Sequence, residues 1–451
     1  MSRKDRTGMQ EQASPHLSRR RGVYPQKQDG LYMQRIRISG GRIGAEQWRR
    51  LAELSAAYCG AAPLHLTTRQ DIELHNVPAD HVAAVEESLA EVGLQTYNAC
   101  GDSIRNITLC PGCDLREGGA DLLGVIETLY ACLVSLPVSD RLPRKFKISF
   151  SACEWRCALP FLNDLGFVLT GRGRFVVFGA GSLGPRPNLG IELADDLGPE
   201  EVIAFTAAVL EIFEERGDRT NRRKARLRHV REHTGDEAFR DLLRRRFEEK
   251  SAGGDYPGVS IRRGKAVLPH VRRLYLPAGD LEIEQALALA ELIDGRGVQS
   301  RLTLTQGIEL YSSARVELSE PLVQLSKGPS IVCCPGADTC VHGAVHTRRL
   351  AQYLRENLPR GFDGTIRISG CPNHCTHTAA AQIGLSGCKK AVDGETHEAY
   401  RVYLSGGDGK SDRLSSPGPA VLEEEVLRYV CEVRRSEHGT APPSVQPKEG
   451  V

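Results

Sequence analysis

The stretch that decides the fold lies late in the chain, where residues 330–340 read Ser-Ile-Val-Cys-Cys-Pro-Gly-Ala-Asp-Thr-Cys and residues 366–375 read Ile-Arg-Ile-Ser-Gly-Cys-Pro-Asn-His-Cys. Four of these cysteines form two pairs: Cys334 with Cys340, and Cys371 with Cys375. Each pair follows a short β-branched run that ends in a turn containing proline or glycine. Such turns leave the sulfurs at strand ends, where neighbouring strands bring them together. Four converging thiolates bind either zinc or an iron–sulfur cluster.

Zinc, disulfides and an iron–sulfur cluster compete as interpretations of these cysteines. Structural zinc sites favour shorter gaps such as Cys-x2-Cys, so the gap between Cys334 and Cys340 is unusual for them. Disulfides fit poorly, because nothing marks the chain as secreted and cytosolic thiols stay reduced. The spacing therefore favours an iron–sulfur cluster and leaves zinc open.

The pattern Cys-x5-Cys followed by Gly-Cys-Pro-Asn-x-Cys resembles the cluster motif of the sirohaem-dependent sulfite and nitrite reductases. In that family four cysteines hold a [4Fe–4S] cluster, and the last one also bridges to the sirohaem iron. The resemblance implies that sirohaem and a [4Fe–4S] cluster are the cofactors, with Cys375 as the bridge. The cluster ligands that it implies are Cys334, Cys340, Cys371 and Cys375.

Length and composition bound the class of protein. The chain has 451 residues, 40% of them hydrophobic, so about three domains is the natural expectation. A net charge of +2 gives no reason to expect a nucleic-acid partner. No apolar stretch has membrane-spanning length and no signal peptide follows Met1, so we expect a cytoplasmic protein without a membrane partner. Fourteen cysteines in such a protein favour metal chemistry over a disulfide framework.

Three motifs occur twice in the same order and predict a duplicated α+β unit. The matches pair residues 66–74 with 302–310, 107–112 with 331–336, and 153–167 with 371–385. The family has two ferredoxin-like half-domains and two larger α/β domains around its sirohaem, related by a pseudo-twofold axis. The expected parts are a disordered tail at 1–23, ferredoxin-like half-domains at 24–98 and 255–325, larger sirohaem and iron–sulfur domains at 99–245 and 326–437, and a tail at 438–451.

The first ferredoxin-like half is expected to alternate strands and helices. Alternation predicts a strand at 31–39, and helical spacing predicts helices at 44–59 and 80–92. Residues 64–77 are expected to be extended. Where two such copies meet, a cavity could hold a large cofactor.

A small oxyanion bound to iron needs compensating positive charge, and its reduction consumes protons. Any one basic residue could instead be an exposed, salt-bridged side chain. The resemblance places two arginines and two lysines at the family's anion-binding positions: Arg37, Arg105, Lys145 and Lys147. We expect the lysines to donate protons, because lysine can release one, and the arginines to orient the anion.

Sirohaem carries many carboxylates, so its pocket should be rich in cations and N–H groups. Arg69 and His75 match family positions that contact the macrocycle, and Arg144 and Asn373 are further candidates. Glu73 departs from the Gln often found in the family, and its carboxyl group needs protonation or a cationic partner. The basic segment 221–226 could line the pocket or form a solvated helix face.

The N-terminal copy has a cysteine quartet of its own: Cys110, Cys113, Cys153 and Cys157. One interpretation is a vestige of duplication, with reduced and buried thiols. The other is a second metal site, zinc or iron–sulfur, because Cys-x2-Cys is good zinc spacing. Thiols without a metal are ordinary core residues, which favours the vestige.

The resemblance implies reduction of sulfite to sulfide, because family members that reduce nitrite commonly carry Asn where this chain has Lys147. Nitrite reduction to ammonia by the same centre is the nearest alternative. A cobalamin-pathway enzyme of the precorrin-3B synthase type and a non-catalytic metal-binding protein are the others. No Gly-x-Gly-x-x-Gly motif or flavin module is evident, so we expect an external electron donor, either a ferredoxin or a flavoprotein subunit.

Overall fold

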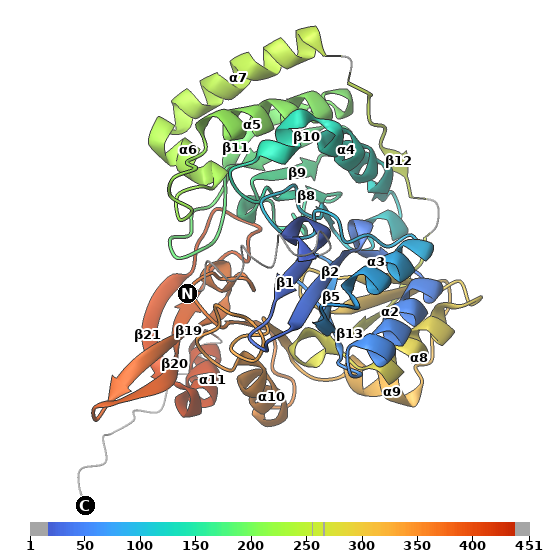
Figure 1. Ribbon diagram of the computed structural model, residues 1–451, viewed down its shortest axis with the longest axis vertical. Helices are drawn as coiled ribbons and strands as arrows, with labels where there is room; N and C mark the ends of the chain where they lie inside the picture. Colours follow the sequence, from blue (N-terminus) through green and yellow to red (C-terminus); the bar gives the residue numbers. More distant parts are fainter. Residues whose placement is uncertain (1–16, 255, 265–266, 438–451) are drawn as a thin grey trace, which may run out of the picture.

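Two copies of one α+β unit make up the computed structural model, which describes residues 17–437 apart from 255, 265 and 266 (Figure 1). Each copy contributes a small antiparallel sheet first and a five-stranded mixed sheet second. The predicted duplicated α+β fold is therefore confirmed.

The two small sheets exchange one strand each. Their strand orders are β1-β2-β5-β4-β14 and β13-β16-β15-β3, so β3 leaves the first copy and β14 leaves the second. Both exchanged strands pair antiparallel with their new neighbours. The strand bounds are β1 Val23–Pro25, β2 Leu31–Arg37, β3 Arg42–Ile43, β4 Leu64–Leu66, β5 Asp71–Pro78, β13 His270–Leu274, β14 Asp280–Leu281, β15 Gln299–Leu302 and β16 Ile308–Ser312.

One hydrophobic core lies under both small sheets. Helices α2 (Ala45–Tyr58) and α8 (Ile283–Ile293) pack against each other, and α3 (Val82–Glu91) packs beside α2. Their apolar residues recur at helical spacing, so Trp48 and Leu289 are fully buried in the shared core. Burying both helices together removes a wide apolar surface from water and ties the two copies to each other.

The two large sheets have the same strand order, β6-β8-β9-β10-β11 and β17-β18-β19-β20-β21. In each, the first three strands are parallel and the last two pairs are antiparallel. The bounds are β6 Thr108–Leu109, β8 Ile148–Ser151, β9 Leu165–Leu169, β10 Phe175–Gly179, β11 Ile191–Leu197, β17 Ser330–Cys333, β18 Thr365–Ser369, β19 Ile383–Val392, β20 Glu395–Leu404 and β21 Ser416–Leu422.

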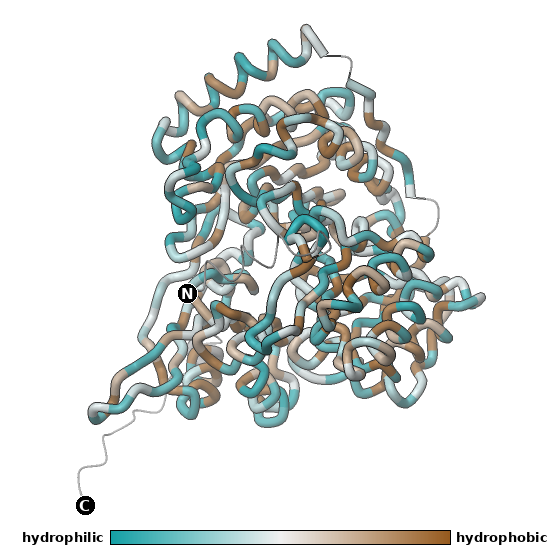
Figure 2. The backbone as a smooth tube through the Cα atoms, in the orientation of Figure 1, coloured by the Kyte–Doolittle hydropathy of each residue, from teal (hydrophilic) through white to brown (hydrophobic). Residues whose placement is uncertain are grey.

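Helices cover both large sheets, and the N-terminal copy has more of them. The bounds are α4 Leu123–Ser135, α5 Val202–Arg216, α6 Leu227–Thr234 and α7 Asp236–Gly253 in the first copy, and α10 Thr347–Asn357 and α11 Val426–Glu437 in the second. The short helix α9 (Glu320–Val323) packs against α8 in the core under the small sheets. Helix α7 packs on α5 at the outside of the body and alternates polar and apolar residues along its turns (Figure 2). No helix in the described part of the chain is both long and apolar enough to cross a membrane.

Two buried glutamines at equivalent positions show how closely the copies correspond. The Gln70 amide donates to the carbonyls of Leu302 and Leu109, both at 2.8 Å, and accepts from the Leu109 N–H. The Gln306 amide donates to the carbonyls of Leu66 and Cys333 and accepts from the Cys333 N–H. Each side chain thus joins its own large sheet to the small sheet of the other copy.

Some expected elements differ from those observed. Residues 17–23 are ordered, although they belong to the expected disordered tail: Arg19–Arg21 is a 3-10 turn whose Arg20 pairs with Asp140 at 2.7 Å. Residues 64–77 contain two strands joined by a turn at Gln70, whose φ is +57°. A left-handed residue closes a tight turn, so an uninterrupted extended segment is wrong there. Residues 1–16 and 438–451 lie outside the described residues.

Candidate functional site

The C-terminal cysteine quartet sits where parallel strands β17 and β18 end. Cys334 directly follows β17, and Cys371 follows β18 after one glycine, so both loops leave the same sheet edge. The backbone N–H of Gly370 donates to Cys334 Sγ at 3.1 Å. Cys375 is the only exposed cysteine of the fourteen. Cys375 is therefore the most accessible member of the quartet, while Cys334, Cys340 and Cys371 are half-buried.

The spacing of the C-terminal sulfurs fits a cluster rather than one ion. In the described part of the chain, only Cys110, Cys113 and Cys153 bring three ligand atoms within 4.8 Å of one another. No three sulfurs of the C-terminal quartet come that close. A [4Fe–4S] cube holds its thiolates further apart than a single ion does, because four metal ions lie between them.

Burial of the C-terminal thiols favours their neutral form when no positive charge is nearby. It raises the pKa of Cys334 to about 12 and the pKa of Cys371 to about 11, and it raises the pKa of Cys340 as well. A bound metal cluster would supply the missing positive charge and would favour the thiolate form of these groups.

Lys145 and Lys147 lie beside Cys375, directly before strand β8. Phe146 between them is fully buried, and its backbone exchanges hydrogen bonds of 2.9 Å with the segment that carries Arg105. Alternation along an extended chain puts both lysines on the side opposite Phe146. The two lysines lie close enough to repel each other, and Arg105 lies close enough to repel Lys145.

The two lysines are held in an environment that disfavours positive charge. Burial, followed by repulsion from Arg226 and Arg105, lowers the pKa of Lys145 to about 7. Burial, followed by repulsion from Arg69 and Lys145, puts the pKa of Lys147 well below its usual range. The Cys375 thiolate offsets part of this cost for both lysines. An excess of buried cations of this kind is stabilised by binding an anion.

Arg69 and Arg105 are both held by hydrogen bonds to the surrounding chain. Arg105 donates to the backbone carbonyls of Ala99 and Gly101, so its guanidinium braces that loop. Arg69 donates to the Asn163 side chain at 2.9 Å and to the backbone carbonyls of Asn106 and Ile148, while its buried Nε has no hydrogen-bond partner in the described chain. Burial lowers the pKa of Arg69 to about 10. Both guanidinium groups therefore brace nearby backbone, and Arg69 keeps one unpaired donor, its Nε.

Arg37 lies at the edge of this group. Its guanidinium stacks over the Tyr130 ring of α4 at 3.5 Å, and its buried Nε and Nη1 have no hydrogen-bond partner. The carboxyl group of Asp71 lies close enough to attract Arg37, Arg69 and Arg105. Asp71 thus links Arg37 to the lysine group, and burial raises its own pKa to about 6.

Two of the expected cofactor contacts, His75 and Arg144, are paired with carboxylates of the chain. His75 is buried, and its Nε2 lies 3.0 Å from Glu73, which also pairs with Arg35 at 2.6 Å. Glu73 therefore has the cationic partner that the sequence required. Arg144 pairs with Asp102 at 2.8 Å.

Asn373 lies beside the cluster cysteines instead of in a buried pocket. It is exposed, and its backbone N–H and side chain both donate to the Cys371 sulfur. Hydrogen bonds of this kind stabilise a thiolate, so Asn373 supports the cluster side of the site.

Two residues of the site, Asp71 and Asp164, were not singled out from the sequence as site residues. Asp164 is fully buried and accepts from Arg226 at 2.7 Å and from the Lys147 N–H at 2.8 Å. The basic segment 221–226 therefore does contribute to the pocket through its last residue. His377 is buried beside Arg367 and Lys147, and burial puts its pKa well below the usual range. It lines a narrow cavity with Thr68, Arg69, Lys147 and Asn163.

Two family models match the N-terminal part of the chain, which carries Arg69, Arg105, Lys145 and Lys147. Residues 24–92 match the family described as nitrite/sulfite reductase ferredoxin-like half domain, and residues 100–251 match the nitrite and sulphite reductase 4Fe-4S domain. The assimilatory ferredoxin-dependent nitrite reductase of Haloferax mediterranei is 30% identical, with 86% of this chain and 76% of that protein aligned. The chain belongs to the nitrite and sulfite reductase family.

Other relatives of the family carry both kinds of name. The ferredoxin–nitrite reductase of Synechococcus elongatus is 30% identical over 89% of this chain and 84% of its own length. The sulfite reductase [NADPH] hemoprotein beta-component of Acidithiobacillus ferrooxidans is 27% identical, with 90% of this chain and 81% of that protein aligned. The NirA protein of Mycobacterium tuberculosis has the same fold, with a TM-score of 0.75, 23% identity, and coverage of 95% of this chain and 88% of that one.

As a member of this family, the chain is an oxidoreductase with a [4Fe–4S] cluster and sirohaem as cofactors. The residues around Cys375 fit a cofactor with many carboxylates. Several of their buried nitrogen atoms have no hydrogen-bond partner within the described chain: Arg37 Nε and Nη1, Arg69 Nε, Arg226 Nε and His377 Nδ1. Buried donors are rarely left unpaired, and carboxylates would satisfy these.

Proposed function

We propose that the chain reduces sulfite to sulfide, with Cys334, Cys340, Cys371 and Cys375 holding the [4Fe–4S] cluster and Cys375 bridging to sirohaem. The observation that carries this proposal is the buried pair Lys145 and Lys147 beside the exposed Cys375 sulfur. Sulfite carries two negative charges and three oxygens, so it suits a pocket with more cations than nitrite needs. When bound, sirohaem supplies the iron that holds the anion, and the cluster supplies electrons.

The lysines bind the anion and deliver its protons. With a pKa of about 7, Lys145 can hold a proton in the cell and release it to a departing oxygen. Lys147 gains a proton when an anion enters, because the new negative charge offsets the repulsion from Arg69. Arg69 orients the anion or the cofactor through its free Nε, and Arg105 fixes the loop beside it.

The test is steady-state turnover of protein purified without air. We expect visible absorption from sirohaem, a [4Fe–4S] electron paramagnetic resonance signal after reduction, and sulfide as the product from sulfite. The proposal is wrong if the pigmented protein oxidises a reduced donor with neither anion. Absence of a sirohaem band with an intact cluster would instead favour the precorrin-3B synthase type, and metal without any turnover would favour a non-catalytic metal protein.

Nitrite reduction to ammonia by the same centre is the second candidate. Two of the compared relatives, from Haloferax mediterranei and Synechococcus elongatus, are named nitrite reductases. The same cationic pocket can bind nitrite, because the smaller anion needs fewer of its donors. The ratio of kcat/KM for sulfite to kcat/KM for nitrite decides between the two, and a ratio below one assigns the chain to nitrite.

A ferredoxin-like protein is the proposed electron donor, because relatives that align over most of this chain are named as ferredoxin-dependent. A separate flavoprotein subunit is the alternative, in line with the NADPH in the name of the Acidithiobacillus relative. A cytoplasmic location fits the absence of disulfides among the fourteen cysteines, all of which the structure describes. Turnover with reduced ferredoxin compared with an NADPH-driven flavoprotein distinguishes the donors.

A further inference from the structure

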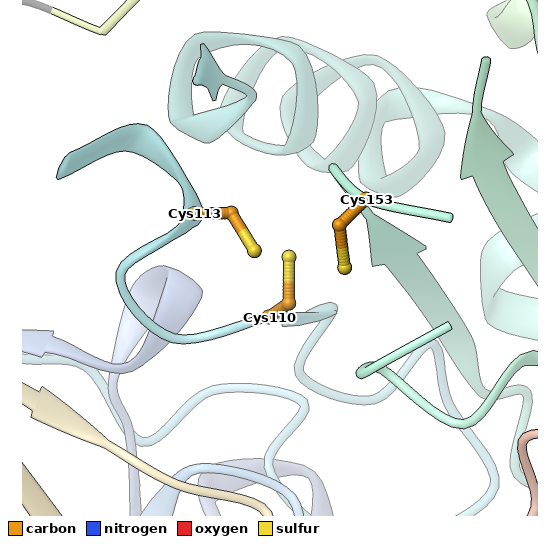
Figure 3. A group of neighbouring side chains, drawn as sticks. All are labelled: Cys110, Cys113 and Cys153. Carbon is orange, nitrogen blue, oxygen red and sulfur yellow. The ribbon is translucent and has the colours of Figure 1, made fainter. Parts of the chain in front are cut away.

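The cysteine quartet of the N-terminal copy converges on one point inside the fold. The sulfurs of Cys110, Cys113 and Cys153 all lie within 4.8 Å of one another and face a common centre (Figure 3). Cys157 completes the quartet, with its Sγ 3.4 Å from the Sγ of Cys153 and in contact with Cys113. Four thiols with no disulfide among them thus meet at a site that the proposed reaction does not use.

The quartet is built on the same scaffold as the cluster site of the other copy. Cys110 follows β6 as Cys334 follows β17, and Cys153 follows β8 as Cys371 follows β18. The N–H of Ala152 donates to Cys110 Sγ at 3.1 Å, which repeats the bond from Gly370 to Cys334. Hydrogen bonds from backbone N–H to sulfur are typical of metal-bound thiolates.

The size of the N-terminal quartet differs from that of a cluster site. Thiolates about 2.3 Å from one zinc ion, at the corners of a tetrahedron, lie roughly 3.8 Å from each other. The observed separations, 3.4 Å for one pair and below 4.8 Å for three sulfurs, bracket that value. Cys113 joins through a Cys-x2-Cys loop, a spacing frequent in zinc sites, instead of the longer loop that carries Cys340.

The loop that carries Cys113 is fixed before any ion binds. Asp114 next to it is ion-paired with Arg42 at 3.0 Å and with Arg301 at 3.4 Å, both from other elements. The N–H of Leu268 donates to the Leu115 carbonyl at 3.0 Å. Cys110 and Cys113 are buried in the core of the N-terminal copy, so the site is closed to substrate.

The geometry points to a single zinc ion bound by the thiolates of Cys110, Cys113, Cys153 and Cys157, in addition to the [4Fe–4S] cluster of the C-terminal copy. A site with four protein ligands has no open position, so the ion is structural. It would tie the ends of β6 and β8 together, and the segments entering these strands carry Arg105 and Lys147. The inference stands on the N-terminal quartet alone and survives if the proposed substrate is wrong.

The test uses the full-length holoenzyme, purified without air from medium that contains zinc and iron. Elemental analysis should give about one zinc per chain, with iron only in the amount required by one [4Fe–4S] cluster and one sirohaem. X-ray absorption at the zinc edge should show only sulfur neighbours, at about 2.3 Å. The measurement on the unaltered protein needs no variant to fold.

Variants then place the zinc on the quartet. Cys113→Ser and Cys157→Ser should each lose zinc at least about 10-fold, while the iron content and visible spectrum stay those of the parent protein. Cys132→Ser, a half-buried cysteine of the same copy outside the quartet, should keep its zinc and serves as the matched control.

Three outcomes would overturn the inference. The first is an unaltered holoenzyme with less than about a tenth of a zinc per chain. The second is iron in excess of one cluster and one sirohaem, which would mean a second cluster or a mononuclear iron. The third is zinc retained in both quartet variants, which would place the ion elsewhere.

Discussion

The two cysteine quartets occupy the same place in the two copies of the fold, yet they are built to different sizes. Both follow parallel strand ends, and both have a left-handed residue just before their last cysteine, Arg156 with a φ of +54° and His374 with a φ of +51°. Side chains other than glycine seldom adopt this conformation, so its repetition marks a constrained turn. Only the second cysteine, Cys113 or Cys340, is placed by a loop of different length. Duplication thus kept the scaffold, and one loop changed the sulfur spacing.

The basic residues divide between the copies just as unequally. Lys145 and Lys147 lie just before strand β8, whereas the equivalent positions of the other copy hold Asp363, just before β18, and Thr365, its first residue. In the proposed function, the C-terminal copy supplies the cluster cysteines and the N-terminal copy supplies most of the cations that face them. A catalytic centre placed between two unlike copies, as proposed, would explain why neither copy carries the complete set.

The largest expected effect is on turnover, and it should distinguish Cys375 from Cys157, the last cysteine of each quartet. Cys375→Ser should lower turnover more than about 100-fold, because it removes the proposed bridge between cluster and sirohaem. The equivalent Cys157→Ser should keep the visible absorption of both cofactors. Absorption and electron paramagnetic resonance spectra of the two variants, with turnover by each, make the comparison. Equal loss of pigment in both would mean that the copies do not differ in function.

The next effect compares Lys147 with its counterpart Thr365. Lys147→Asn should lower kcat/KM for sulfite about 100-fold and for nitrite less than about 10-fold, since it removes a cation and a proton source. Thr365→Ser, which can keep the hydrogen bond to Ser330, should leave both values near those of the parent enzyme. An equal fall for both anions in Lys147→Asn would remove the argument for sulfite.

A smaller effect concerns pH. The pKa of Lys145 lies near 7, so its ammonium loses the proton as pH rises through that value, and turnover should fall on the alkaline side. Lys145→Arg keeps the charge but cannot release a proton in this range, so its kcat should be lower and its alkaline fall absent. The measurement is kcat, separated from KM, between pH 6 and pH 9. An unchanged alkaline fall in the variant would assign it to another group.

The smallest effect compares the two bridging glutamines. Gln70→Met and Gln306→Met each leave buried backbone groups unpaired, which should lower the free energy of unfolding by about 2–3 kcal/mol. Equal losses, measured by denaturant unfolding of the two variants, would show that both copies contribute alike to the junction. A loss confined to one variant would show that the symmetry of the contacts is not a symmetry of energies.

Much of this arrangement could be predicted from the sequence, because the repeated motifs lie at strand ends and turns. The pairing of Lys145 and Lys147 on one face followed from alternation alone. The contact between Arg226 and Asp164 could not, since a run of basic residues looks like a solvated helix face until the fold buries its last member. Asp71 was missed for a similar reason, because its four arginine neighbours, Arg35, Arg37, Arg69 and Arg105, come from three separate segments. The strand exchange was also invisible, as β3 and β14 have only two residues each.

That exchange has a consequence for how the polypeptide could be divided. A break between residues 254 and 268 would release two fragments, each lacking the edge strand that the other carries. Each fragment would expose unpaired backbone groups and half of a shared apolar core, and would gain both back only by joining its complement. Fission of the gene at this point would therefore yield an obligate heterodimer whose subunits are insoluble alone.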